Sequence, residues 1–185
     1  MRKNFGVKPW FYPLPVLIVG SYDENGQADA MNAAWGGLYD ANLVELCLSS
    51  GHKTTKNIKA TGAFTISFAD AKNVAKCDYV GIVSANNTPD KMEKAGFTVT
   101  KSSFVNAPII EELPMTLECR LKKVTEEGNI IGEIVNISVD DSILDENGQI
   151  DLAKLQPIAF DPVKNDYRVI GEKVGNAFED GNKLK

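Results

Sequence analysis

The sequence predicts a mainly β domain with a few helices, in which antiparallel strands form a closed or nearly closed barrel. The chain has 185 residues, the usual size of one domain, and 43% of them are hydrophobic, which is enough for a core. Short segments rich in β-branched and aromatic residues recur between turn signals. Strands and helices do not alternate regularly, and no G-x-G-x-x-G follows a first strand, which disfavours a doubly wound sheet.

The N-terminal part is expected to contain four strands and one helix. The strands are predicted at residues 15–22, 28–35, 43–48 and 63–68. Asn25 and Gly26 form a turn between the first two strands, because this pair readily supplies positive φ. A helix is predicted over residues 52–61, since Gly62 follows it as a natural C-terminal cap.

The remaining part is expected to contain three helices and three strands. The helices are predicted at residues 70–80, 88–96 and 151–156, and the strands at 114–124, 130–139 and 158–160. In the first of these strands Glu118, Arg120 and Lys122 alternate with apolar residues, so one face is expected to contact water. We expect a single domain over residues 1–185 with a polar tail from about residue 179.

Composition excludes several classes of function. The net charge of −5 and the pI near 5.0 argue against nucleic acid and against an anionic membrane surface as partners. The longest apolar run, residues 16–19, is far too short to span a membrane, so the cytoplasm is the expected location. Cys47, Cys77 and Cys119 are far apart and are expected to be reduced core thiols. One histidine, His52, cannot build a His-rich metal site, and no metal is expected.

Residues 49–58 predict a possible anion site. They read as a strand end, a turn of small residues and a helix start, where unpaired backbone N–H groups carry positive partial charge. The side chains that could surround a phosphate there are Ser49, Ser50, Lys53, Thr54 and Thr55. The alternative is a surface helix capped by Ser and Thr, and these residues alone favour that alternative.

Residues 32–37 form the second notable segment. Small residues around Trp35 would let a planar ligand approach the backbone, and Gly36 and Gly37 permit that closeness. The alternative is a core tryptophan at a strand end, with the glycines marking a bulge. On these residues alone the alternative is favoured.

The order of short motifs along the chain resembles the flavin reductase-like family, in particular its flavoredoxin branch. Each motif is weak alone, but their shared order is specific and covers nearly the whole chain. The motifs are residues 15–16, 23–26, 32–35, 52–58, 62–64, 78–84, 90–91, 117–119, 131–135 and 167–172. In place of the glycine that the family often has after Ser84, this chain has Ala85.

The resemblance implies an FMN-binding split β-barrel, usually a homodimer with flavin near the subunit interface. Residues that would face the isoalloxazine ring are Asn32, Ala33, Ala34 and Trp35. Residues that would hold the phosphate and ribityl chain are Ser49, Ser50, His52, Lys53, Thr54 and Thr55. Further positions carried over near the flavin are Ser84, Lys91, Phe160 and Tyr167, with Lys91 or N–H donors near the N1–C2=O edge.

The implied function is that of an FMN-dependent oxidoreductase, in which NADH or NADPH passes hydride to flavin N5. No side chain must act as acid or base in that step, so no catalytic residue is expected. The first alternative is an electron carrier of the flavoredoxin type, reduced by a partner protein. The second is a flavin-free binding or structural dimer. No nicotinamide motif is visible in the sequence, so it does not separate the reductase from the carrier.

Overall fold

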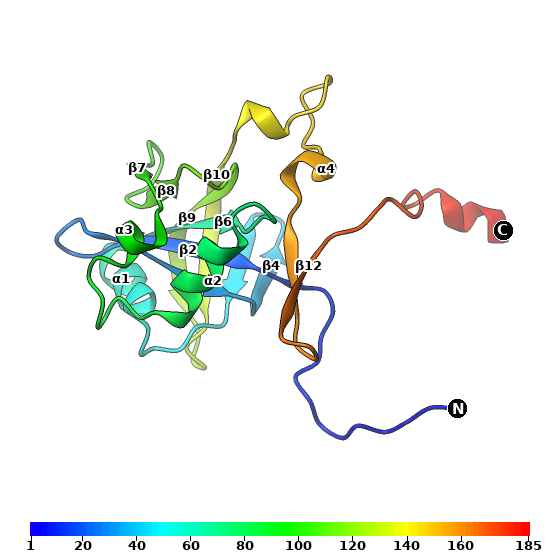
Figure 1. Ribbon diagram of the computed structural model, residues 1–185, viewed down its shortest axis with the longest axis horizontal. Coiled ribbons are helices and arrows are strands. Elements are labelled where there is room, and N and C mark those ends of the chain that lie inside the picture. Colours follow the sequence, from blue (N-terminus) through cyan, green and yellow to red (C-terminus); the bar gives the residue numbers. More distant parts are fainter.

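Seven antiparallel strands form one curled sheet, the main feature of the fold (Figure 1). They are β2 (Leu17–Tyr22), β3 (Ala28–Ala33), β4 (Gly36–Asp40), β5 (Leu43–Leu46), β6 (Ala63–Phe68), β9 (Met115–Val124) and β10 (Ile130–Val139). The computed structural model describes residues 1–185 and gives the strand order β3-β2-β6-β9-β10-β5-β4. The predicted antiparallel split barrel is confirmed.

Two smaller sheets and four helices complete the structure. A three-stranded sheet contains β1 (Leu14–Pro15), β11 (Ile158–Asp161) and β12 (Asp166–Val169), and a hairpin contains β7 (Val99–Lys101) and β8 (Pro108–Ile110). The helices are α1 (Lys53–Thr61), α2 (Val74–Ile82), α3 (Lys91–Ala95) and α4 (Leu152–Leu155), with short 3-10 helices at Asp141–Ile143 and Asp180–Leu184. None of the helices combines the length and the apolar character that crossing a membrane requires.

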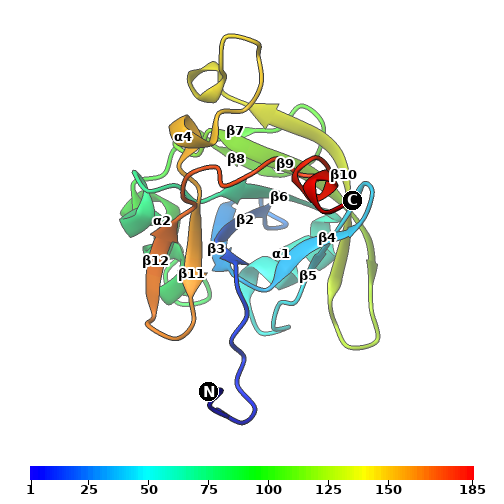
Figure 2. The same ribbon diagram turned by 90° about the vertical axis from the view of Figure 1, so that its right-hand side faces the viewer.

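Strand β2 is buried on both of its faces and so joins two hydrophobic clusters. Leu17 and Val19 point into the curled sheet, where they pack with Ile58 of α1. Ile18, which alternates with them, belongs to the opposite cluster with Val80 of α2. Figure 2 shows α1 within the curve of the sheet, while α2 lies outside it.

The two edge strands of the sheet, β3 and β4, are consecutive in the chain. Only Ala34 and Trp35 separate them, so the sheet must curl until its first and last strands meet at this connection. Gly36 makes the close approach possible, because a Cβ there would lie 2.6 Å from Leu46 Cδ2 and 2.9 Å from the Glu45 carbonyl oxygen. The split of the barrel therefore lies at residues 34–36.

Several predicted elements are confirmed and others are corrected. The strand over residues 63–68 is β6, and the helix before Gly62 is α1, which ends with Gly62 at φ 72°. The strand expected over residues 28–35 ends at Ala33, and strands β4, β7, β8 and β12 were not predicted. The helix expected from residue 88 begins only at Lys91.

The prediction of a wet face on β9 is wrong at Glu118. This side chain is 1% exposed, and its carboxylate accepts hydrogen bonds from Ser102 Oγ and from Asn136 Nδ2, the latter at 2.6 Å. Arg120 is exposed as expected. Ser102 reaches Glu118 from outside the strand, whereas Arg120 and Lys122 further along it are exposed. Cys47 is likewise exposed and is not a core thiol.

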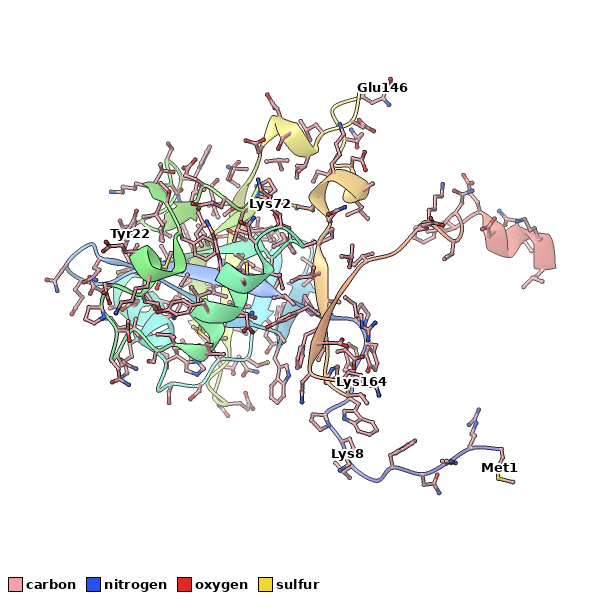
Figure 3. All side chains as sticks on the ribbon, viewed as in Figure 1. Met1, Lys8, Tyr22, Lys72, Glu146 and Lys164 are labelled. Atoms are coloured by element: carbon pink, nitrogen blue, oxygen red, sulfur yellow. The ribbon has the colours of Figure 1, made fainter.

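Both ends of the chain leave the body of the domain. In Figure 1 the first residues and the last residues extend away from the sheets, and Figure 3 shows the side chains of the N-terminal segment projecting from it near Met1 and Lys8. Large apolar side chains in these two arms are exposed: Phe5, Val7, Phe11, Val174, Phe178 and Leu184.

Candidate functional site

A polar cleft of about 150 Å³ opens at the N-terminus of α1. Strand β3, the start of α1 and the segment from α2 to α3 supply its walls. Its polar and charged lining residues are Asp29, His52, Lys53, Thr54, Ser84 and Lys91. The fold thus brings together five residues that the sequence had assigned to the site, and it adds Asp29.

The start of α1 is not capped by a side chain. His52 occupies the N-cap position but makes no capping hydrogen bond. The first N–H groups of a helix have no partner within the helix, so this end is able to bind an anion. The hydroxyl of Thr55, in the first turn, is buried and has no hydrogen-bond partner. The unpaired N–H groups fit an oxyanion ligand, whereas Thr55 is not among the residues that line the cleft.

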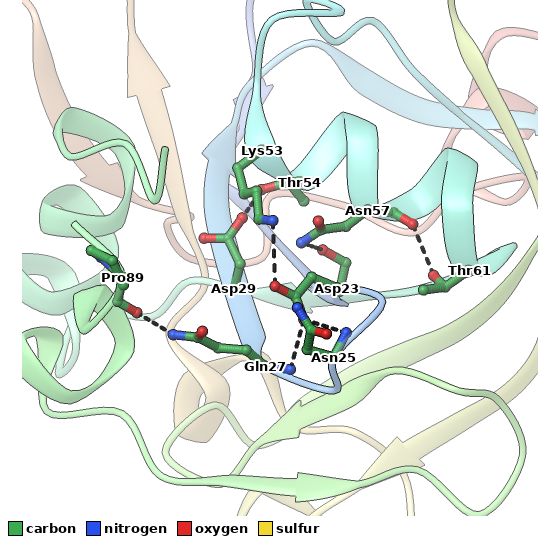
Figure 4. A network of polar contacts seen from close by, with 10 residues as sticks. Asp23, Asn25, Gln27, Asp29, Lys53, Thr54, Asn57, Thr61 and Pro89 are labelled. Atoms are coloured by element: carbon green, nitrogen blue, oxygen red, sulfur yellow. Dashed lines mark hydrogen bonds and ion pairs between the residues drawn. The ribbon is translucent and has the colours of Figure 1, made fainter. Parts of the chain in front are cut away.

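Two lysine–aspartate pairs lie at or beside this cleft, and Asp23 lines an adjoining pocket that shares Asp29 and Lys53 with it. Lys53 Nζ is 3.3 Å from Asp23 Oδ2, and Lys91 Nζ is 3.4 Å from Asp29 Oδ1. The Thr54 hydroxyl donates to the other oxygen of Asp29 at 2.6 Å, and Figure 4 shows Asp29 and Asp23 reaching toward the start of α1. Each ammonium therefore faces the cleft with a carboxylate beside it.

The protonation of these groups follows from their surroundings. Burial lowers the pKa of Lys91, and the charge and hydrogen bond of Asp29 act in the opposite direction. The pKa of Asp23 is lowered chiefly by the backbone N–H of Gln27, with a smaller contribution from Lys53. The pair of Lys53 and Asp23 is thus more open to solvent than the pair of Lys91 and Asp29. The charge of Asp23 also depends less on its lysine partner.

The loop over residues 84–90 forms another wall and is fastened at two points. Asn86 Nδ2 donates to the Gly51 carbonyl at 3.1 Å, and Gln27 Nε2 donates to the Pro89 carbonyl at 2.6 Å (Figure 4). Ala85 is not among the residues with positive φ, so this turn does not require the glycine that the family often has there. Alanine is accommodated without strain.

A larger groove of about 590 Å³ lies beside Trp35. It is bounded by residues 8–15 of the N-terminal segment and by β4 and β5, and Ala34 and Cys47 also line it. Trp35 is 59% exposed, so the alternative of a core tryptophan is wrong. A volume of this size is in the range of small-molecule sites.

Asn32 and Ala33 face away from that groove. Asn32 Nδ2 donates to the Cys77 carbonyl at 3.2 Å, and a Cβ on Gly81 would lie 2.9 Å from Asn32 Cβ, so the side chain is held against α2. The side chain of Ala33 belongs to the inner core cluster. Of the four residues expected at the ring, the structure places Ala34 and Trp35 in the groove.

Five other predicted residues line neither the cleft nor the groove, and one of them, Thr55, is buried in the first turn of α1. Ser49 and Ser50 are exposed in the turn before α1, where Ser49 Oγ accepts a hydrogen bond from the Gly51 N–H at 3.3 Å. Phe160 and Tyr167 face each other across β11 and β12, with ring centroids 6.0 Å apart. Neither serine nor either aromatic side chain lines the cleft or the groove.

Tyr167 is fixed by a polar contact with α2. Its hydroxyl donates to Asp78 Oδ1 at 2.7 Å. Burial, followed by the hydrogen bond and charge of Asp78, raises the pKa of Tyr167 to about 12. The hydroxyl is therefore neutral at physiological pH and ties the small sheet to the helix that holds Asn32.

Sequence reasoning missed the two carboxylates, Asp23 and Asp29. Asp23 was visible only as part of a turn, and its side chain accepts the N–H groups of Asn25 and Gln27, both at 2.9 Å. No local pattern marks Asp29, because its partners Thr54 and Lys91 are 25 and 62 residues away.

Comparisons of the sequence and of the structure with known proteins both lead to flavin reductase-like proteins. A sequence profile described as "Flavin reductase like domain" matches residues 11–157. The structure of a flavoredoxin from Desulfovibrio vulgaris (Miyazaki F) is 36% identical, with a TM-score of 0.94, covering 98% of this chain and 100% of that chain. A flavoredoxin from Methanosarcina acetivorans is 28% identical, with a TM-score of 0.90 and full coverage of both chains.

The matches to curated relatives cover a smaller part of each chain. An uncharacterized protein of Aquifex aeolicus is 34% identical over 111 residues, which are 57% of this chain and 55% of the relative. One from Aeropyrum pernix is 28% identical over 137 residues, which are 70% of this chain and 51% of the relative. The chain thus spans about half the length of these two relatives.

Proposed function

Because the chain belongs to the flavin reductase-like family, we propose that it binds FMN and works as an NAD(P)H-dependent flavin reductase or oxidoreductase. Family membership and the flavoredoxin neighbours indicate a flavin-linked redox role. The observation that supports FMN as the ligand is the cleft at α1, where an uncapped helix start lies beside the ammonium groups of Lys53 and Lys91.

The cleft and the groove support a placement for the two ends of this cofactor. The phosphate would bind in the cleft, held by the N–H groups at the start of α1 and by Lys53. The ring would lie in the groove at Ala34 and Trp35. Strand β3 leads from one toward the other, and the six residue steps from Asp29 to Trp35 span at most roughly 20 Å.

The position of Lys91 refines the expected role of this residue. It lines the same cleft as His52, Lys53 and Thr54, which makes the phosphate end of the cofactor its nearer partner, rather than the N1–C2=O edge of the ring. When bound, FMN would supply the hydride and electron chemistry. The chain's own part would be to hold the phosphate, to orient the ring beside Trp35 and to limit its contact with water.

The carrier alternative is supported by one specific finding. Two solved structures that match this chain with TM-scores of 0.94 and 0.90 are both described as flavoredoxins. A carrier would receive electrons from a partner protein, whereas a reductase would take them from NADH or NADPH. The groove beside Trp35 is open to solvent and is compatible with either donor.

We also propose that the working form is a homodimer. Apolar side chains such as Phe5, Val7 and Phe178 are exposed in two arms that leave the body, where they are available for contact with a partner. A second copy, related by a two-fold axis, would cover them. Light scattering should give twice the 20.1 kDa mass of one chain. A monomeric mass at micromolar concentration would refute the dimer.

One experiment tests the main proposal and separates the two donors. Purified protein is titrated with FMN, with fluorescence quenching as the readout, and is then mixed with FMN and NADH or NADPH under argon. Binding followed by bleaching of flavin absorbance at catalytic protein concentration supports the reductase. Binding with slow bleaching that accelerates only with a reduced redox protein supports the carrier. If the protein does not quench FMN fluorescence, the proposal is refuted and the flavin-free alternative is supported.

A further inference from the structure

The two lysine–aspartate pairs at the cleft have similar lengths but very different burial. In the pair of Lys91 and Asp29 the side chains are 4% and 5% exposed, and the atoms are 3.4 Å apart. In the pair of Lys53 and Asp23 they are 33% and 13% exposed, and the atoms are 3.3 Å apart. The chain therefore contains a buried pair and a matched pair that is more open to water.

A buried ammonium group keeps its proton only if a nearby charge compensates for lost hydration. The groups around Lys91 are few. From β3 it faces Asp29, and from α1 it shares the cleft with His52 and Lys53. Its neighbour in sequence, Asp90, is paired with Lys94 at 3.1 Å on the exposed side of α3. Asp29 is thus the one carboxylate in contact with the Lys91 ammonium.

Asp29 also determines what Thr54 offers to a ligand. The Thr54 hydroxyl donates its proton to Asp29 Oδ2 at 2.6 Å and is 1% exposed. A hydroxyl has one proton to donate, so this proton is not free for an anion in the cleft. What remains for an anion is the backbone N–H groups of the first turn of α1, and the hydrogen bond from Thr54 to β3 fixes where they point.

We propose that Asp29 is the positioning residue of the cleft: its buried carboxylate keeps the Lys91 ammonium charged and anchors the start of α1 through Thr54, so that the cleft presents a positive wall to an oxyanion. This inference rests on the proposed phosphate site for FMN. The two oxygens of Asp29 already accept from Thr54 and Lys91, so Asp29 would act on the phosphate through these two residues. Its negative charge strengthens anion binding, although carboxylates near an anion are ordinarily repulsive.

The test compares Asp29→Asn with the matched variant Asp23→Asn. Dissociation constants for FMN are measured between pH 7 and pH 9, above the second pKa of a phosphate monoester near 6. In the wild type and in Asp23→Asn, affinity should hardly change across this range. In Asp29→Asn the affinity for FMN should fall by up to about tenfold per pH unit once Lys91 loses its proton. Adding Lys91→Met to this variant should remove the dependence on pH.

A second readout does not depend on FMN. In the flavin-free wild type, carbon-13 NMR of the lysine Cε atoms, assigned with Lys91→Met, should show Lys91 protonated throughout pH 7 to pH 9. In Asp29→Asn that resonance should titrate within or below this range. A wild-type Lys91 that is neutral at pH 8, or an Asp29→Asn variant with the wild-type pH profile, would overturn the inference. Absence of FMN binding with the expected NMR titration would refute the phosphate site alone.

Discussion

Replacement of Lys53 by alanine should weaken binding of FMN but leave binding of riboflavin nearly unchanged, because riboflavin lacks the phosphate. A hydrogen bond to a charged group contributes about 1.5–3 kcal/mol, which is roughly 10- to 100-fold in affinity. Lys53 is a third exposed and already pairs with Asp23 at 3.3 Å. Solvent screening and the loss of that pair place the expected effect at the lower end, roughly tenfold.

The assay is fluorescence titration of both flavins with the wild type, Lys53→Ala and the control Lys56→Ala. Lys56 is exposed on the same helix, one turn nearer its middle. The Lys53 variant should stay folded, since Lys53 is a third exposed and an ion pair of this kind, partly open to solvent, contributes about 1 kcal/mol. Equal losses for FMN and riboflavin, or a similar loss in the Lys56 variant, would refute a phosphate site at the start of α1.

Three further outcomes are expected. Trp35→Ala should lower the affinities for FMN and riboflavin alike by roughly tenfold, with little change in unfolding free energy, since Trp35 is 59% exposed. Gly132→Ala should cost about 1–3 kcal/mol in urea unfolding, because the new Cβ would lie 2.3 Å from Phe64 Cζ, and Phe64→Leu should relieve part of that clash. The stability advantage of the wild type over Tyr167→Phe should be full at pH 8. It should shrink as pH rises from the unfolded tyrosine pKa near 10 through the folded pKa of about 12; a constant difference would contradict this.

Elements with local signals were predictable from the sequence, and elements defined by distant partners were not. Strand β6 alternates apolar residues, and α1 stops at Gly62 with φ 72°, so both could be located. Strand β4 begins with two glycines and exists because it pairs with β5. Strand β12 is likewise held by its ladder with β11, and its residues show no strong period of their own.

The site was predictable in the same limited sense. The start of α1 could be noted as a possible anion site from small residues, hydroxyls and one lysine. For Trp35 the residues alone favoured a core position, and only the family resemblance pointed to a ligand there. Asp29 could not, because its role depends on Lys91, which is 62 residues away. Glu118 shows the same limit, since alternation predicts a wet face and only the structure, with its contact to Ser102, reveals that it is buried.

The position of the site follows from the way the barrel is split. A closed barrel has no free edges, whereas this sheet ends at β3 and β4, and edge strands leave backbone groups without sheet partners. Those two strands are joined by only Ala34 and Trp35. One edge, β3, lines the cleft at α1, and the other, β4, lines the groove at Trp35. The interruption of the sheet therefore brings unpaired backbone, a helix N-terminus and an exposed aromatic ring together along one path.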